Sequence, residues 1–118
     1  MIPISKAAIV KESSSLKDLI YEVSSKKQGI ALIKKSNKIT GVFSDGDLRR
    51  QLQKNVDIQK TKVGSVMKKK FKAIKNEELI SEAAKRMKRY KVYNLVVEEK
   101  NNIVGILTMH DILEANVL

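Results

Sequence analysis

Apolar and polar positions along the chain follow two different periods, and the same succession of periods occurs twice. An apolar run at 7–10 predicts a short strand, and apolar residues three and four positions apart at 16–27 predict an amphipathic helix. The stretches at 29–33 and 38–43, with Lys-Ser-Asn at 35–37 as the turn, predict the two strands of a hairpin. A second helix is expected to begin near Ser44. The predicted order is therefore strand, helix, strand, strand, helix.

The second half of the chain shows the same order. Strands are expected at 71–74, 93–98 and 102–107, and helices at 77–90 and from Thr108 onward. The two halves correspond without a gap at a constant spacing of 64 residues. The pairs that show this best are Asn37 and Asn101, Ile39 and Ile103, Gly41 and Gly105, and Asp47 and Asp111.

This internal repeat predicts two domains, at 1–58 and 59–118, joined near residues 55 to 63. Neither unit alone would bury a large core. We expect the two copies to pack sheet to sheet around a pseudo-two-fold axis and to leave two related clefts. Clefts between two halves of a molecule are common ligand sites.

Composition limits the classes of protein to consider. The 118 residues include no cysteine, which excludes disulfides and cysteine-ligated zinc and predicts a reducing, cytoplasmic environment. No apolar run approaches the roughly 18 residues that span a bilayer, and the first residues lack the pattern of a signal peptide. We therefore expect no membrane partner.

The net charge of +11 raises the possibility of nucleic-acid binding. The lysines are scattered in pairs and one triplet, and aromatic residues, which stack on bases, make up only 4% of the chain. A solvated lysine-rich surface is the favoured interpretation, and nucleic-acid binding the less favoured one. Such a surface also attracts small anionic ligands.

Each predicted hairpin ends in glycine, two apolar residues, a hydroxyl residue and, three positions later, an aspartate. The pairs Ser44 with Asp47 and Thr108 with Asp111 fit a capping box, in which hydroxyl and carboxylate satisfy free N–H groups at a helix start. The same groups suit a ligand, because a helix N-terminus attracts phosphate and a carboxylate accepts the hydroxyls of a ribose. The preceding glycine permits close approach of a ligand or of neighbouring backbone. Both interpretations stay open from the residues alone.

The two copies differ around this motif. The first adds Asp45 and the neighbouring Arg49 and Arg50, whose guanidinium groups could grip phosphate or belong to a solvated helix face. The second contains His110, the only histidine, which could contact a ligand or be merely structural or exposed. No nucleophile–base pair, metal-ligand cluster or phosphate-binding glycine loop is evident. We expect no catalytic residues, no metal and no cofactor in this chain.

Two such units, each ending in Gly-x-x-Ser/Thr-x-x-Asp, resemble a pair of CBS domains, known as a Bateman module. The resemblance covers essentially the whole chain and implies an α+β fold of tandem CBS domains. It implies that Ser44, Asp47, Thr108 and Asp111 contact the phosphate and ribose of a nucleotide. It also implies regulation of an attached enzyme or transporter, and association into dimers.

Three segments narrow the resemblance. The stretches "GVFSDGDLRRQL" at 41–52, "VGSVMKKKFKAI" at 63–74 and "GILTMHDILEANVL" at 105–118 are similar to the regulatory region of arabinose 5-phosphate isomerases. This implies a sugar isomerase domain in cis, in the pathway to Kdo and lipopolysaccharide, and an adenine nucleotide or CMP-Kdo as ligand. Two alternatives are a dimerisation module that senses no ligand and the CBS pair of a sugar nucleotidyltransferase.

Overall fold

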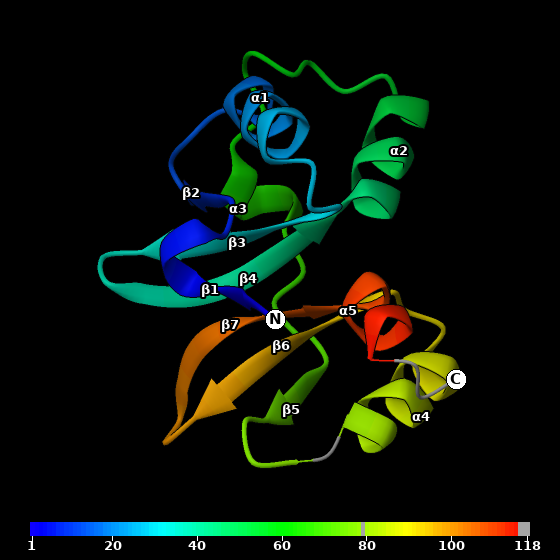
Figure 1. The fold of residues 1–118 in the computed structure, drawn as a ribbon. Coiled ribbons are helices and arrows are strands. Elements are labelled where there is room, and N and C mark those ends of the chain that lie inside the picture. The colour runs from blue at the N-terminus through cyan, green and yellow to red at the C-terminus, as the bar shows by residue number, and fades with distance from the viewer. Residues whose placement is uncertain (79, 116–118) are drawn as a thin grey trace. The chain divides into compact units, whose positions relative to one another are not determined.

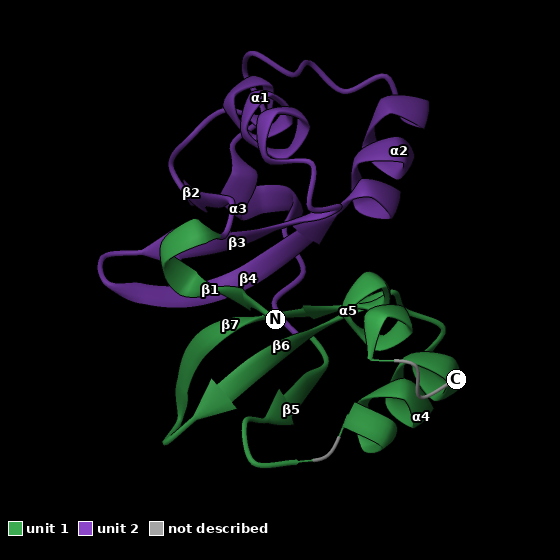
Figure 2. Ribbon diagram, in the orientation of Figure 1, with its two compact units in different colours: residues 1–6, 71–118 green, residues 7–70 purple. Residues whose placement is uncertain are grey.

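The computed structural model describes residues 1–78 and 80–115, and the chain forms two compact units. We call residues 7–70 the first unit (purple, labelled unit 2 in Figure 2). Residues 1–6 together with 71–118 are the second unit (green, labelled unit 1 in Figure 2). The predicted order of strand, helix, strand, strand, helix is confirmed in both.

The limits of these compact units differ from the domain limits expected from the sequence, 1–58 and 59–118. Residues 59–70 pack with the first repeat, and residues 1–6 pack with the second. The domain boundaries themselves stay a prediction, but each repeat is completed by the segment that precedes the other repeat in the chain.

The first unit contains a three-stranded sheet in the order β2-β3-β4 (Figure 1). Strands β2 and β3 are parallel, and β3 and β4 form an antiparallel hairpin. Its elements are β2 (Ile9–Lys11), α1 (Leu16–Lys26), β3 (Ile30–Lys35), β4 (Lys38–Ser44), α2 (Asp45–Gln53) and α3 (Val63–Val66).

The second unit repeats this sheet and adds one edge strand, in the order β1-β7-β6-β5. Strand β1 is antiparallel to β7, and β5 is parallel to β6. The elements are β1 (Ile2–Pro3), η1 (Ile4–Lys6), β5 (Ala73–Lys75), α4 (Ile80–Tyr90), β6 (Asn94–Glu99), β7 (Asn102–Thr108) and α5 (Met109–Glu114).

The register of the two hairpins is the same at the spacing of 64 residues. Ser44 lies opposite Ile30 in the first hairpin, and Thr108 lies opposite Asn94 in the second. Both hairpins shift register at the equivalent step, after Ile33 and after Val97. The hydroxyl residues of both motifs therefore lie at the same end of equivalent hairpins, where a strand passes into a helix.

Helix α1 illustrates how local sequence sets an element. The Ser15 side chain caps its start by accepting the Asp18 N–H at 3.2 Å, and Lys27 ends it in the left-handed conformation with φ of 56°. Its apolar face packs against one side of the three-stranded sheet, and together they form the core of the first unit. The buried members of that core are Ala8, Val10, Leu16, Leu19, Val23, Ala31, Ile33, Phe43 and Val63.

The structure corrects the predicted start of the helix at residue 77. Residues 77 and 78 lie in a turn, closed by a hydrogen bond from the Glu78 N–H to the Lys75 carbonyl at 3.0 Å. In the described residues the helix begins at Ile80, and Leu79 lies outside them. The sequence also gave no sign of β1, η1 or α3, which are too short for a periodic pattern.

Gly41 and Gly105 are the strand glycines at which the sequence predicted close approach of a ligand or of neighbouring backbone. Both lie against backbone of their own unit. A Cβ added at Gly41 would lie 2.6 Å from Met67 Sδ and 2.8 Å from the Lys68 carbonyl oxygen. A Cβ at Gly105 would lie 2.5 Å from the Ile2 carbonyl oxygen. The missing side chains let a neighbouring segment cross each hairpin.

We expect Gly41→Ala to lower the free energy of unfolding by about 1–3 kcal/mol, because the Lys68 carbonyl cannot move without breaking its strand-like pairing with Val42. Gly46→Ala is the matched control. Its Cβ would meet nothing nearer than 3.6 Å in α2, so we expect no loss and a gain of up to about 1 kcal/mol. Urea unfolding of the three proteins measures both values, and equal losses would contradict the crossing at Gly41.

Candidate ligand-binding site

The junction between β4 and α2 carries the first candidate site. Ser44 ends the strand and caps the helix, with its Oγ accepting the Asp47 N–H at 3.3 Å. Asp47 Oδ2 accepts the Ser44 backbone N–H at 2.9 Å and the Ser44 hydroxyl at 3.0 Å. The capping box predicted from the sequence is thus confirmed. It holds the hydroxyl and the carboxylate together at the end of the hairpin opposite its turn.

The second carboxylate oxygen of Asp47 is paired with cations. Arg50, one turn further along α2, forms an ion pair with Asp47 Oδ1, and Lys68 Nζ lies 3.7 Å from the same oxygen. The Asp47 side chain is only 9% exposed, whereas Arg50 and Lys68 are each 54% exposed. A nearly buried anion is therefore paired with two half-exposed cationic side chains.

Opposing effects act on the Asp47 carboxyl. Burial alone would raise its pKa, because a charge loses hydration there. The hydrogen bond from the Ser44 N–H, those from Arg50 and the Ser44 hydroxyl, and the charge of Lys68 outweigh burial, so the pKa of Asp47 lies below its usual value. Asp47 is ionised at neutral pH.

The second unit builds the same arrangement between β7 and α5. Thr108 Oγ1 accepts the Asp111 N–H at 3.2 Å, and Asp111 Oδ2 accepts the Thr108 N–H at 2.9 Å and hydroxyl at 3.1 Å. The α-amino group of Met1 lies 3.3 Å from Asp111 Oδ1. Burial would raise the pKa of Asp111, but the Thr108 hydrogen bonds and this positive charge lower it below its usual value.

Three other residues expected at the site lie at its margin. Asp45 is an exposed residue of the first turn of α2, and its N–H donates to the Gly29 carbonyl at 3.0 Å. Arg49 is also exposed. His110 is 77% exposed, and its Nε2 lies 2.9 Å from Glu114 Oε1, one turn further along α5. Among the described residues, none of the three forms a hydrogen bond or ion pair with the side chain of Asp47 or Asp111. Their role in binding stays a prediction.

Arg50 and Lys68 complete the first site. From the sequence, Arg50 was one of two arginines considered as phosphate ligands, whereas Lys68 was not assigned to the site. Arg50, rather than Arg49, faces Asp47, and a helical spacing of three residues was the available signal. Lys68 reaches the site because its backbone pairs with Val42 of β4, with N···O distances of 2.9 and 3.0 Å. The triplet of lysines at 68–70 gave no hint of that pairing.

The arrangement suits a ligand with both hydroxyl and phosphoryl groups. An ionised carboxylate accepts hydrogen bonds from a diol, and neighbouring guanidinium and ammonium groups bind phosphate oxygens. Arg50 and Lys68 are each about half-exposed, and both pair with the same carboxylate oxygen, Asp47 Oδ1.

Comparison with known proteins agrees with this geometry. Residues 63–117 match the family model of the CBS domain. The chain is also 36% identical over 107 residues to the arabinose 5-phosphate isomerase KdsD of Francisella tularensis, an alignment that covers 90% of this chain and 33% of the isomerase. Residues 63–117 therefore belong to the CBS-domain family. The chain spans about a third of the length of the isomerase that it matches.

Solved CBS proteins share the fold over nearly all of the chain. An uncharacterized conserved protein from Pyrococcus horikoshii has a TM-score of 0.88 and 21% identity, covering 99% of this chain and 89% of its own. CBSX2 in complex with AMP has a TM-score of 0.82 and 27% identity, covering 99% and 92%. The α+β fold of tandem CBS units is thereby confirmed. Within residues 1–78 and 80–115, no helix has the length and apolar character needed to cross a bilayer.

The lowered pKa of both aspartates predicts a pH dependence of stability. A carboxyl whose pKa is lower in the folded state stabilises the fold above its unfolded pKa, and this contribution is lost as the pH falls through the folded value. We expect the free energy of unfolding to fall below about pH 4, near the unfolded pKa of aspartate. Asp47→Asn should lower stability at about pH 7 and make the acid decline shallower.

Asp111→Asn is the matched comparison. The Asp111 side chain is 21% exposed against 9% for Asp47. Asp111→Asn should therefore cause a smaller loss of stability at neutral pH and a smaller change in the acid decline than Asp47→Asn. Urea unfolding from about pH 7 down to about pH 3 covers the relevant window. An acid decline as steep in Asp47→Asn as in the unchanged chain would contradict the assigned electrostatics.

Proposed function

We propose that the chain is a nucleotide-binding regulatory pair of CBS units in an arabinose 5-phosphate isomerase. The observation that carries this proposal is the double occurrence of one arrangement, an ionised aspartate locked to a strand-end hydroxyl, at Ser44 with Asp47 and at Thr108 with Asp111. Similarity to KdsD supports the attached isomerase, and the AMP complex of CBSX2 supports the nucleotide.

In the proposed complex, Asp47 accepts the ribose hydroxyls, and Arg50 and Lys68 bind the phosphate. Asp111 has no partner in its unit equivalent to Arg50, since Leu113 and Glu114 follow it in α5 at the corresponding positions. The two sites should therefore differ in their demand for phosphate. Adenine nucleotides are the first candidates, and CMP-Kdo is the pathway-based alternative.

Regulation requires that the nucleotide bind two states of the attached catalytic domain with different affinity. The proposed activity of that domain is the interconversion of ribulose 5-phosphate and arabinose 5-phosphate. Full-length protein assayed for this reaction with and without the nucleotide tests the regulatory part. Dimerisation of this chain without nucleotide binding would instead favour the purely structural alternative.

A thermal-shift series with AMP, ADP, ATP, CMP, CMP-Kdo and arabinose 5-phosphate tests binding directly. A ligand selective for the folded state at about 100 times its Kd adds about 2.7 kcal/mol of stability. For a domain of this size we expect a rise in Tm of several degrees. The double variant Asp47→Ala with Asp111→Ala should lose the rise relative to its own Tm. An unchanged rise in that variant would contradict the site.

The neighbouring arginines allow a sharper test, because only Arg50 faces Asp47 although both are exposed. We expect Arg50→Gln to weaken AMP binding about tenfold, or about 1.4 kcal/mol, while adenosine binding changes little. Arg49→Gln should leave the ratio of AMP to adenosine affinity unchanged. Calorimetric titration of both ligands measures the ratio, and equal losses in the two variants would indicate a general charge effect rather than a phosphate contact.

A further inference from the structure

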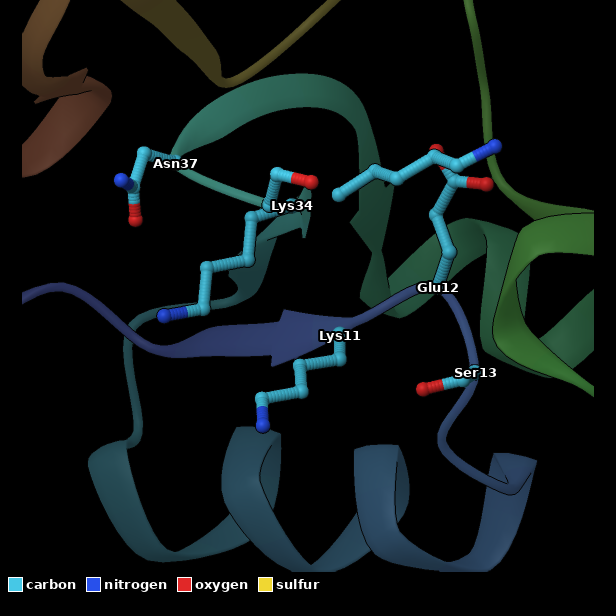
Figure 3. A pocket seen from close by; sticks show the side chains of 7 residues that line it. Lys11, Glu12, Ser13, Lys34 and Asn37 are labelled. Atoms are coloured by element: carbon cyan, nitrogen blue, oxygen red, sulfur yellow. The ribbon is translucent and has the colours of Figure 1, made fainter.

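The end of the first sheet farthest from Ser44 holds an unusual pair of like charges. Lys11 of β2 and Lys34 of β3 are partners in the parallel register. Figure 3 shows both side chains extending to the same side of the strands. With Asn37, Ser13 and other residues they line a hollow of about 580 Å³.

No acidic side chain in the described residues neutralises this pair. Neither lysine forms an ion pair there, and like charges at paired strand positions are destabilising. Lys35 adds a third positive charge to the lining. Glu12 also borders the hollow, but its carboxylate points away from Lys11 and accepts the Thr40 hydroxyl at 2.6 Å (Figure 3).

The second unit provides an internal comparison. At the register positions equivalent to Lys11 and Lys34 it has Lys75 and Glu98, a pair of opposite charge. The position equivalent to Lys35 is Glu99, also an acidic residue. The same backbone thus accepts a complementary pair in one unit, so two lysines are not a requirement of the fold.

We propose that the hollow at Lys11 and Lys34 binds a dianionic phosphoryl group, either free phosphate or the monoester of a small metabolite. Two ammonium groups supply charge, and the Asn37 amide and the Ser13 hydroxyl supply further hydrogen-bond donors. A bound dianion removes the repulsion between the lysines, so the fold gains stability from it.

This site is distinct from the nucleotide site and does not rest on it. Ser44 pairs with Ile30 at one end of the hairpin, whereas Lys35 pairs with Lys38 at the other. At about 3.3 Å per residue, the length of β3 separates the two ends by roughly 15 Å. A mononucleotide in one site would leave the other open.

Amide chemical shifts of the ¹⁵N-labelled chain, titrated with inorganic phosphate at constant ionic strength in chloride, test the proposal. We expect saturable shifts confined to residues 11–13 and 34–37. Parallel titrations with ribose 5-phosphate and AMP identify the source: tighter binding of ribose 5-phosphate at these residues indicates a monoester, and equal binding indicates free phosphate. Absence of local saturable shifts with all three probes overturns the proposal.

The variant Lys34→Glu reproduces the charge pair of the second unit, so it should fold with an equal or higher Tm. We expect it to weaken phosphate binding at least tenfold and to abolish the stabilisation by phosphate. Lys75→Gln, in the second unit, should titrate as the unchanged chain does. Equal phosphate affinity in Lys34→Glu, or shifts spread over lysines of the whole chain, would overturn the site. Neither result bears on AMP binding at Ser44 and Asp47.

Discussion

A carboxylate that reaches back from the first turn of a helix to the strand before it fixes the geometry of each unit. In the first unit, Asp47 is hydrogen-bonded to both the backbone and the side chain of Ser44, so the end of the strand and the first turn of the helix are tied together. A nearly buried charge is tolerated because both of its oxygens accept hydrogen bonds and two cations lie beside it. The groups that satisfy the helix start are the same ones that we propose for ligand binding. Capping and the proposed binding are thus consequences of one arrangement.

The strand glycines determine which cations reach these carboxylates. Because Gly41 has no side chain, Met67 and Lys68 cross β4 closely, and the Lys68 ammonium group comes within reach of Asp47. In the second unit the segment that contains Ile2 crosses β7 at Gly105 in the same way. Each hairpin is therefore crossed by a segment that precedes the other repeat in the sequence. Such a contact joins segments that are far apart in the sequence, so it depends on the tertiary structure.

The sequence predicted what depends on local pattern. Strand and helix order, the repeat, and the capping boxes at Ser44 and Thr108 all follow from periodicity and short-range hydrogen bonding, and the structure agrees. It could not predict that residues 1–6 belong with the second repeat, because two residues of strand carry no period. To choose Arg50 over Arg49, one must know which side of α2 faces Asp47. To place Lys68 at the site, one must know that its backbone pairs with Val42 of β4. The paired lysines at 11 and 34 became visible only with the strand register.

Strand β1 has a consequence for how the molecule meets other chains. A sheet edge with free N–H and carbonyl groups is a template on which a foreign strand can add, with aggregation as the hazard. Here the edge beside β7 is closed by a strand of two residues, one of which is Pro3, the only proline in the sequence. Proline has no N–H to offer, so the hydrogen-bond ladder cannot continue through it. A strand that adds at this edge therefore finds no N–H at Pro3 and must take its backbone partners from the residues on either side of it.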